Sequence, residues 1–205
     1  MSENSKKGIE LFSFASKMKR ILVNASNIMM RYSNLEAFYM MSSYEQWNVG
    51  ERNEPLPISD AEATEFLKKA VSILCEEENT SVNYVRYDFE LGKPWTIRRF
   101  MQVFGTDIVV NQIDKSIWIK LTINEIIDGA VYEFPCDTII TDCRQKHEED
   151  ALRALGAKFI FVNKDTENDD SHITEQGLIP KSGDIVIDNN GTLEQLNNQI
   201  KEIFK

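Results

Sequence analysis

The segment from residue 137 to residue 162 restricts the fold more than any other part of the chain. It reads DTIITDCRQKHEEDALRALGAKFIFV: a short apolar run, a helical stretch that ends at Gly156, and a second apolar run. A short strand on each side of one helix is typical of parallel strands joined by a crossover. The pattern therefore predicts an α/β protein with an open parallel sheet. Because ligands bind beyond the carboxyl ends of such strands, Asp142, Arg144 and the segment after Val162 are placed at that edge.

Hydrophobic spacing predicts the elements of the first half. Residues 9–14 suit a short strand, and a helix is expected from near Ser16, followed by an irregular or partly helical stretch over 24–58. A helix begins at Ser59, whose capping box with Glu62 precedes apolar residues at helical spacing. Residues 81–91 alternate and predict an extended segment.

A second group of helices follows. Apolar residues over 97–104 repeat at helical spacing and Gly105 is expected to end that helix, which leaves Arg98, Arg99 and Gln102 off the buried stripe. A longer helix is expected from about residue 107 to 127. A strand within 184–191 and a last helix, capped by Thr192 and Gln195, complete the chain. The last helix is expected to turn these residues inward: Leu193, Leu196, Ile200, Ile203 and Phe204.

Composition excludes several function classes. With 205 residues the chain suits a single domain, 1–205. No apolar run approaches a membrane span and the first residues lack an export signal, so a cytoplasmic protein is expected. A net charge of −10 disfavours DNA or RNA polymers as partners. Three cysteines without Cys-x-x-Cys spacing and two histidines predict reduced thiols and no metal site.

The residues that could carry chemistry are arginines. Arg144 follows a strand end and precedes a helix, where its guanidinium suits a phosphate or carboxylate, and Arg98 and Arg99 form a second basic pair. Periodicity alone favours the alternative that Arg144 forms a structural ion pair with Asp142 or Glu148.

His172 could act as a general base, but its polar loop favours a solvent-exposed role. The three tryptophans are expected in the core: Trp47, Trp95 and Trp118.

Four segments carry a family resemblance. They are WTIRRFMQVFGTDIVVNQIDKSIWIK, TDCRQKHEEDALRALGAKFIFV, DDSHITEQGL and GDIVIDNNGTLEQLNNQIKEIF, in that order. Together they resemble the deoxynucleoside monophosphate kinases of T-even-type tailed bacteriophages, closely from about Ser59 onward and more weakly over 9–25. The resemblance implies transfer of the γ-phosphoryl group of ATP to a deoxynucleoside monophosphate with Mg²⁺, in the cytosol of the host of a phage.

The resemblance also assigns parts and residues. It implies a core of 9–24 and 135–205, a mainly helical monophosphate-binding insertion at 25–134, and a lid-like loop at 163–177. Arg98, Arg99 and Gln102 would hold the monophosphate and base, and Asp142 and Arg144 would face the phosphates. The lid residues are Lys164, His172 and Glu175.

Two departures from the family pattern weaken the expectation of catalysis. No Gly-x-x-x-x-Gly-Lys-Ser/Thr loop occurs in the 205 residues, which start just before the family's second strand, so the expected fold is a three-layer P-loop-kinase-like sheet missing its first strand. The lid has Val162-Asn163-Lys164 and Glu167 where the family has a Val-Arg-Pro opening and a lysine. Phosphoryl transfer depends on such positioning and positive charge, so no catalytic residue is assigned.

Three functions stay open. The first is a nucleotide-binding protein without catalysis, which sequesters a small nucleotide, such as a host immune signalling nucleotide, or regulates another protein. The second is a kinase that uses ATP and Mg²⁺ and whose P-loop comes from another chain or was truncated. The third is a non-catalytic interaction module. An exposed sheet edge also predicts a homo-oligomer or a partner that covers it.

Overall fold

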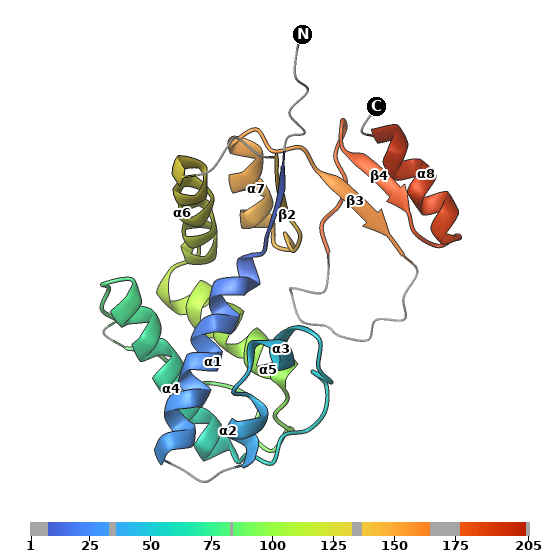
Figure 1. The fold of residues 1–205 in the computed structure, drawn as a ribbon. Coiled ribbons are helices and arrows are strands. Elements are labelled where there is room, and N and C mark those ends of the chain that lie inside the picture. Colours follow the sequence, from blue (N-terminus) through green and yellow to red (C-terminus); the bar gives the residue numbers. More distant parts are fainter. Residues whose placement is uncertain (1–7, 33–35, 83, 133–136, 165–176, 204–205) are drawn as a thin grey trace. The chain divides into compact units, whose positions relative to one another are not determined.

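The computed structural model describes residues 8–32, 36–82, 84–132, 137–164 and 177–203 (Figure 1). The chain forms two compact units, residues 1–143 and 144–205, and each is described by itself.

The first unit is mainly helical and contains one pair of strands. Its elements are β1 (Ile9–Phe12), α1 (Phe14–Tyr32), α2 (Glu36–Met40), α3 (Tyr44–Asn48), α4 (Asp60–Glu77), α5 (Ile97–Gln102), the π-helix η1 (Val103–Ile113), α6 (Ile117–Tyr132) and β2 (Asp137–Ile140). β1 and β2 pair in parallel, with Ile9 opposite Asp137 and Phe12 opposite Ile140. The ends of the unit's sequence therefore meet in one small sheet, and the helices lie between them in the chain.

The second unit is smaller and also contains helices and one pair of parallel strands. It consists of α7 (Lys146–Ala154), β3 (Ile160–Asn163), β4 (Ile185–Asp188) and α8 (Leu193–Ile203). β3 and β4 are parallel, with Ile160 opposite Ile185. Among the described residues the strands thus form two two-stranded parallel sheets. This confirms an α/β protein with parallel strands, whereas the larger three-layer sheet stays a prediction.

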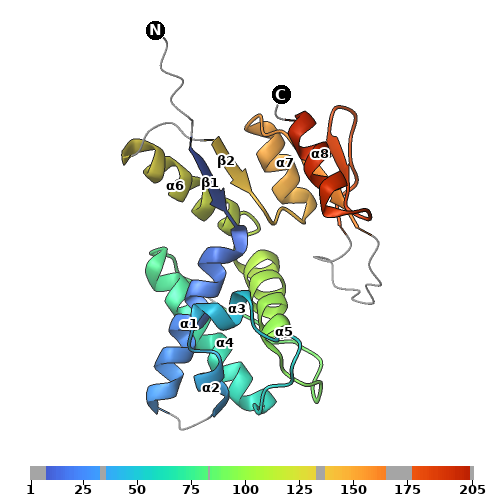
Figure 2. The ribbon, with the colours of Figure 1, turned by 45° about the vertical axis from the view of Figure 1, so that its right-hand side comes forward.

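The core of the first unit lies among α1, α2, α4, α5 and η1. α1 packs against α4 and α6, as both ribbon views show (Figures 1 and 2). A row of aromatic rings links the other helices, with centroid separations of 5.8 Å between Phe38 and Phe66, 4.9 Å between Phe66 and Phe100, and 4.5 Å between Phe100 and Trp95. All four side chains are at most 1% exposed, so the row is the apolar centre of the unit.

Three predictions for the first unit are confirmed. Ser59 caps α4, because its side chain accepts from the Glu62 amide while the Glu62 carboxylate accepts from the Ser59 amide. The stretch 24–58 is partly helical, since α1 continues to Tyr32 and two short helices follow. The three tryptophans are buried as predicted, and each indole N–H donates to a protein oxygen: Trp47 to Met41, Trp95 to Asp60 and Trp118 to Gly105.

The expected helix end at Gly105 is wrong. The chain continues through this residue as a π-helix, and the next break comes at Asp114–Ser116, so the helix expected over 107–127 is divided into η1 and α6. Gly105 is buried, and a Cβ atom there would collide with the sulfur of Met18 on α1. Glycine is needed here for close packing between helices, and not for a turn.

In the second unit the predicted helix end at Gly156 is confirmed. Gly156 has a φ of 82°, its amide donates to Arg153, and the Ala157 amide donates to Leu152, which is the Schellman arrangement. The predicted cap of α8 is also present, since Thr192 and Gln195 exchange hydrogen bonds. The inward face expected for α8 is wrong at Leu193, which is 74% exposed, and α8 has no buried residue among those described.

Candidate functional site

The predicted acceptor residues lie on α5 in the first unit. Thr96 caps this helix, since its hydroxyl accepts from the Arg99 amide at 3.0 Å. Ile97 and Phe100 are buried, whereas Arg98, Arg99 and Gln102 are partly exposed. The prediction that these three lie off the buried stripe is therefore confirmed. Arg98 and Gln102 lie one helical turn apart, so one ligand could contact both.

Arg99 is engaged with the loop that precedes α5. Its guanidinium carbon lies 3.9 Å from the centre of the Trp95 ring, and its nitrogens donate to the carbonyl oxygens of Lys93 and Glu90. Burial lowers the pKa of Arg99, and the nearby acids Asp60 and Glu90 oppose that shift. The geometry gives Arg99 a structural role as a cation stacked on an indole.

Asp60, in the first turn of α4, holds the same loop from the other side. Its carboxylate accepts from the Trp95 indole at 2.7 Å and from the Gly92 amide at 2.9 Å. Both hydrogen bonds lower the pKa of Asp60. The bond from the Gly92 amide has the larger effect and the bond from the Trp95 indole the smaller one. The loop from Glu90 to Trp95 is thus fixed between α4 and α5.

Arg98 has an arginine neighbour that sequence analysis missed. The Arg98 amide donates to the Arg52 carbonyl at 2.9 Å, and the Leu56 amide donates to the Trp95 carbonyl at 2.7 Å. The loop between α3 and α4 therefore runs alongside the start of α5. The backbones of two partly exposed arginines are thus adjacent, and no periodic pattern in the sequence indicates Arg52 as a site residue.

Asp142 caps a helix that lies far from it in sequence. It follows β2, and its carboxylate accepts from the Ser13 hydroxyl at 2.6 Å, the Phe14 amide at 2.8 Å and the Ala15 amide at 2.9 Å. These groups form the start of α1, so the negative charge lies at the positive end of that helix. Its strand-end position is as predicted, and its role toward a phosphate stays a prediction.

Arg144 belongs to the second unit, where it precedes α7. The Glu148 carboxylate accepts from the backbone amides of Arg144 and Gln145, both at 2.8 Å. Glu148 is 6% exposed, whereas Arg144 is exposed. Sequence reasoning paired Glu148 with the Arg144 side chain as one alternative, and the structure shows it as a cap for the backbone of α7.

Lys164 is the lid residue that the structure describes, and it is exposed just beyond β3. His172 and Glu175 lie outside the described residues, as does most of the predicted lid 163–177.

Metal ligands do not cluster in the described part of the chain. No group of three or more His, Cys, Asp or Glu side chains there could hold a metal ion. The Asp142 oxygens, which the resemblance placed near the phosphates, are bonded to the start of α1. Cys75 and Cys143 are free thiols, and no described helix is long and apolar enough to cross a membrane.

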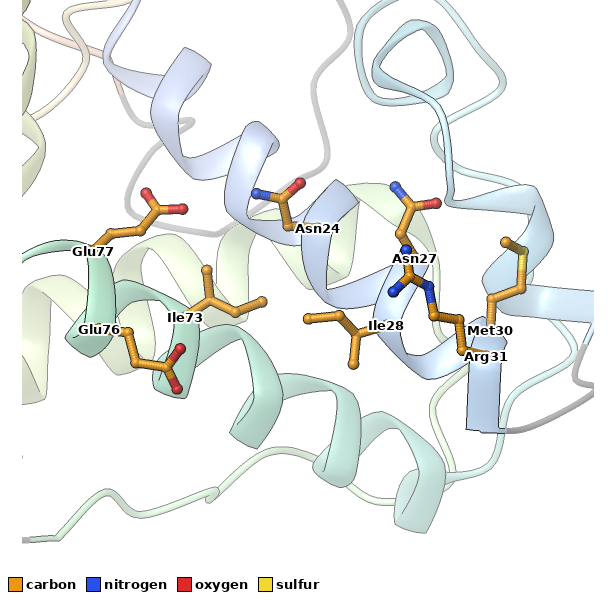
Figure 3. Close-up of a pocket in the computed structure, with 8 residues that line it drawn as sticks. All are labelled: Asn24, Asn27, Ile28, Met30, Arg31, Ile73, Glu76 and Glu77. Carbon is orange, nitrogen blue, oxygen red and sulfur yellow. The ribbon is translucent and has the colours of Figure 1, made fainter.

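Two cavities in the first unit lie away from the predicted residues. One, of about 500 Å³, lies between α1 and α4 and is lined by Asn24, Asn27, Ile28, Met30, Arg31, Ile73, Glu76 and Glu77 (Figure 3). The other, of about 690 Å³, lies near the end of η1 and the start of α6, with Gln112, Asp114 and Lys120 in its wall. Neither contains Arg98, Arg99, Gln102 or Asp142.

Comparison with known proteins identifies the family. The family model described as deoxynucleotide monophosphate kinase matches residues 2–200. The chain is 38% identical over 146 residues to the deoxynucleotide monophosphate kinase of Enterobacteria phage T4, covering 67% of this chain and 59% of that protein. It is 44% identical over 118 residues to the enzyme of the same name from Escherichia phage RB69, covering 56% of this chain and 47% of that protein. The chain thus spans about half the length of these relatives. On this evidence the chain belongs to the deoxynucleotide monophosphate kinase family.

Proposed function

We propose that these 205 residues bind a deoxynucleoside monophosphate through the arginines at the start of α5 and do not transfer phosphate by themselves. The observation that carries the proposal is the 2.9 Å hydrogen bond from the Arg98 amide to the Arg52 carbonyl. It brings the backbones of two arginines together in a chain with a net charge of −10, and the proposal adds that both side chains turn toward one ligand. In this proposal the two guanidinium groups bind a dianion such as a monophosphate, because each can donate two parallel charge-assisted hydrogen bonds.

The second part of the proposal rests on the ATP side of the reaction. The 205 residues contain no Gly-x-x-x-x-Gly-Lys-Ser/Thr loop. Phosphoryl transfer depends on a backbone cradle, a lysine and a metal that neutralises charge. A nucleotide bound to these residues alone is therefore held without being phosphorylated, which suits sequestration or regulation.

The family favours a second function, phosphoryl transfer when a P-loop is supplied by other residues. Both relatives named above are called kinases, and the chain covers 59% and 47% of them. In this alternative other residues supply the P-loop, and Arg144 and Lys164 contact the phosphates of ATP. The monophosphate site is the same in both functions.

Calorimetry with the four deoxynucleoside monophosphates tests the proposal. Binding of at least one is expected, and Arg98→Ala and Arg52→Ala should each weaken it by roughly 2–5 kcal/mol if the charge pair is buried in the complex. Arg20→Ala, an exposed arginine on α1, is the matched control and should not change the affinity. Absence of binding to all four would remove the proposal. An ATP-coupled assay then separates the two functions, because turnover by the chain alone would contradict the loss of transfer.

A further inference from the structure

The contacts of the Arg99 side chain indicate a different role from that of its neighbour Arg98. The resemblance assigns both arginines to the nucleotide, but the Arg99 guanidinium stacks on Trp95 and donates to the carbonyls of Lys93 and Glu90. Two of the five guanidinium N–H donors of Arg99 are directed at these carbonyls, so they are turned away from a phosphate. Stacking on the Trp95 indole also fixes the direction in which the Arg99 guanidinium points.

The contacts of Trp95 continue toward the proposed site. Its indole N–H donates to Asp60, and its carbonyl accepts from the Leu56 amide at 2.7 Å. Leu56 lies in the same loop as Arg52, whose carbonyl accepts from the Arg98 amide. Trp95 thus connects the Asp60 and Arg99 side chains to the backbone that carries Arg52 and Arg98.

We infer that Asp60, Trp95 and Arg99 form a positioning cluster, which holds the loop of Arg52 against α5 while leaving phosphate contact to Arg52 and Arg98. This inference rests on the proposed function. Arg99 is therefore a positioning residue, and its side chain acts through the loop 90–95. A site arranged in this way loses affinity when the loop is released, because ordering the loop then becomes part of the cost of binding.

The charge state of the ligand distinguishes contact from positioning. The second pKa of a phosphate monoester is about 6, so a monophosphate passes from monoanion to dianion between about pH 5 and pH 7. A guanidinium that touches the phosphate increases the preference for the dianion, whereas a residue that only holds a loop changes the affinity for both forms alike.

The experiment measures the affinity for the tightest-binding deoxynucleoside monophosphate across this pH range in the full chain and three variants. Arg98→Gln is expected to reduce the preference for the dianion. Arg99→Gln is expected to weaken binding about tenfold at every pH with the preference unchanged, and to increase amide hydrogen exchange at Gly92. Trp95→Phe, which keeps a ring and loses the donor to Asp60, should behave like Arg99→Gln, and it carries the test if Arg99→Gln does not fold.

Two results would overturn the inference. Loss of the dianion preference in Arg99→Gln, as in Arg98→Gln, would show that Arg99 contacts the phosphate. Unchanged affinity in Arg99→Gln, with faster exchange at Gly92, would show that the loop does not position the site. Failure of the unmodified chain to bind any monophosphate is a different result, and it removes the proposed function itself.

Discussion

Asp142 and Phe14, 128 residues apart in the chain, are joined by a 2.8 Å hydrogen bond from the Phe14 amide to the Asp142 carboxylate. The carboxylate supplies a negative charge that the first turn of α1 does not contain, and the Ser13 hydroxyl just before the helix donates to the same carboxylate. The residue that follows β2 therefore stabilises the helix that follows β1.

Replacing Asp142 with Ala should destabilise the first unit by about 1 kcal/mol, the usual cost of removing a helix cap. The loss arises because the Phe14 and Ala15 amides are left without their acceptor. Urea unfolding monitored by circular dichroism measures it. Asp128→Ala is the matched control, since Asp128 is exposed on α6, and it should change stability by only a few tenths of a kcal/mol. Equal effects of the two substitutions would contradict the capping role.

Replacing Gly105 with Ala should destabilise the protein by about 1–3 kcal/mol, because the added methyl group meets the Met18 sulfur in a packed core. The cost should shrink in a Met18→Ala background, which a double-mutant cycle measures from urea unfolding. Gly129→Ala on α6 is the control: its Cβ would have 3.9 Å to the nearest atom, and alanine should stabilise that helix by roughly 0.5–1 kcal/mol. If the double-mutant cycle shows no coupling between Gly105 and Met18, the proposed clash is contradicted.

Replacing Phe66 with Ala should cost about 3–5 kcal/mol, since the ring is fully buried between Phe38 and Phe100. Phe66→Leu retains apolar volume and should cost less, because it removes mainly the ring–ring contacts, about 0.5–1.5 kcal/mol for each aromatic pair. Thermal unfolding of both variants provides the measurement. If Phe66→Leu lowers the stability as much as Phe66→Ala, the apolar volume of the side chain does not explain the contribution of Phe66.

Asp184 should make the second unit less stable in acid. The hydrogen bonds from Arg153, then that from the Lys181 amide, lower the pKa of Asp184 from 3.8 to about 2. Because the folded-state pKa is the lower one, the contribution is full above pH 3.8 and is lost as the pH falls toward about 2.

The comparison of the parent chain with Asp184→Asn measures this contribution. The difference in their urea midpoints should be constant near neutral pH and should close over that acid range. Glu194→Gln, which removes an exposed acid on α8, is the control. A difference that persists unchanged to about pH 2 would mean that ionisation of Asp184 is not the cause.

Local chemistry was predicted from the sequence at three helix ends where both partners lie within one turn of helix. The pairs Ser59 with Glu62 and Thr192 with Gln195 are three residues apart, and Gly156 closes its own helix. At Gly105 the same local logic failed, because a glycine that ends a helix and one that admits a neighbouring helix look alike in sequence. Only the position of Met18 on α1 separates the two cases.

The candidate site was predictable in part for the same reason. Spacing placed Arg98 and Gln102 on an open helix face, and resemblance supplied their role. Arg52 was missed because it reaches α5 through a backbone hydrogen bond, which leaves no mark on residue type or spacing. The contacts that distinguish Arg99 from Arg98 could not be predicted either. The sequence does not indicate which of two adjacent arginines lies over Trp95.

The pairing of β1 with β2 has a consequence for how the chain folds. During synthesis β1 leaves the ribosome before β2, and the helices from α1 to α6 are made between them. A contact with so large a sequence separation carries a high loop-closure entropy unless the intervening helices have already condensed. The sheet of the first unit is therefore expected to close late, and until then β1 presents an unpaired strand that a chaperone or a neighbouring chain can reach.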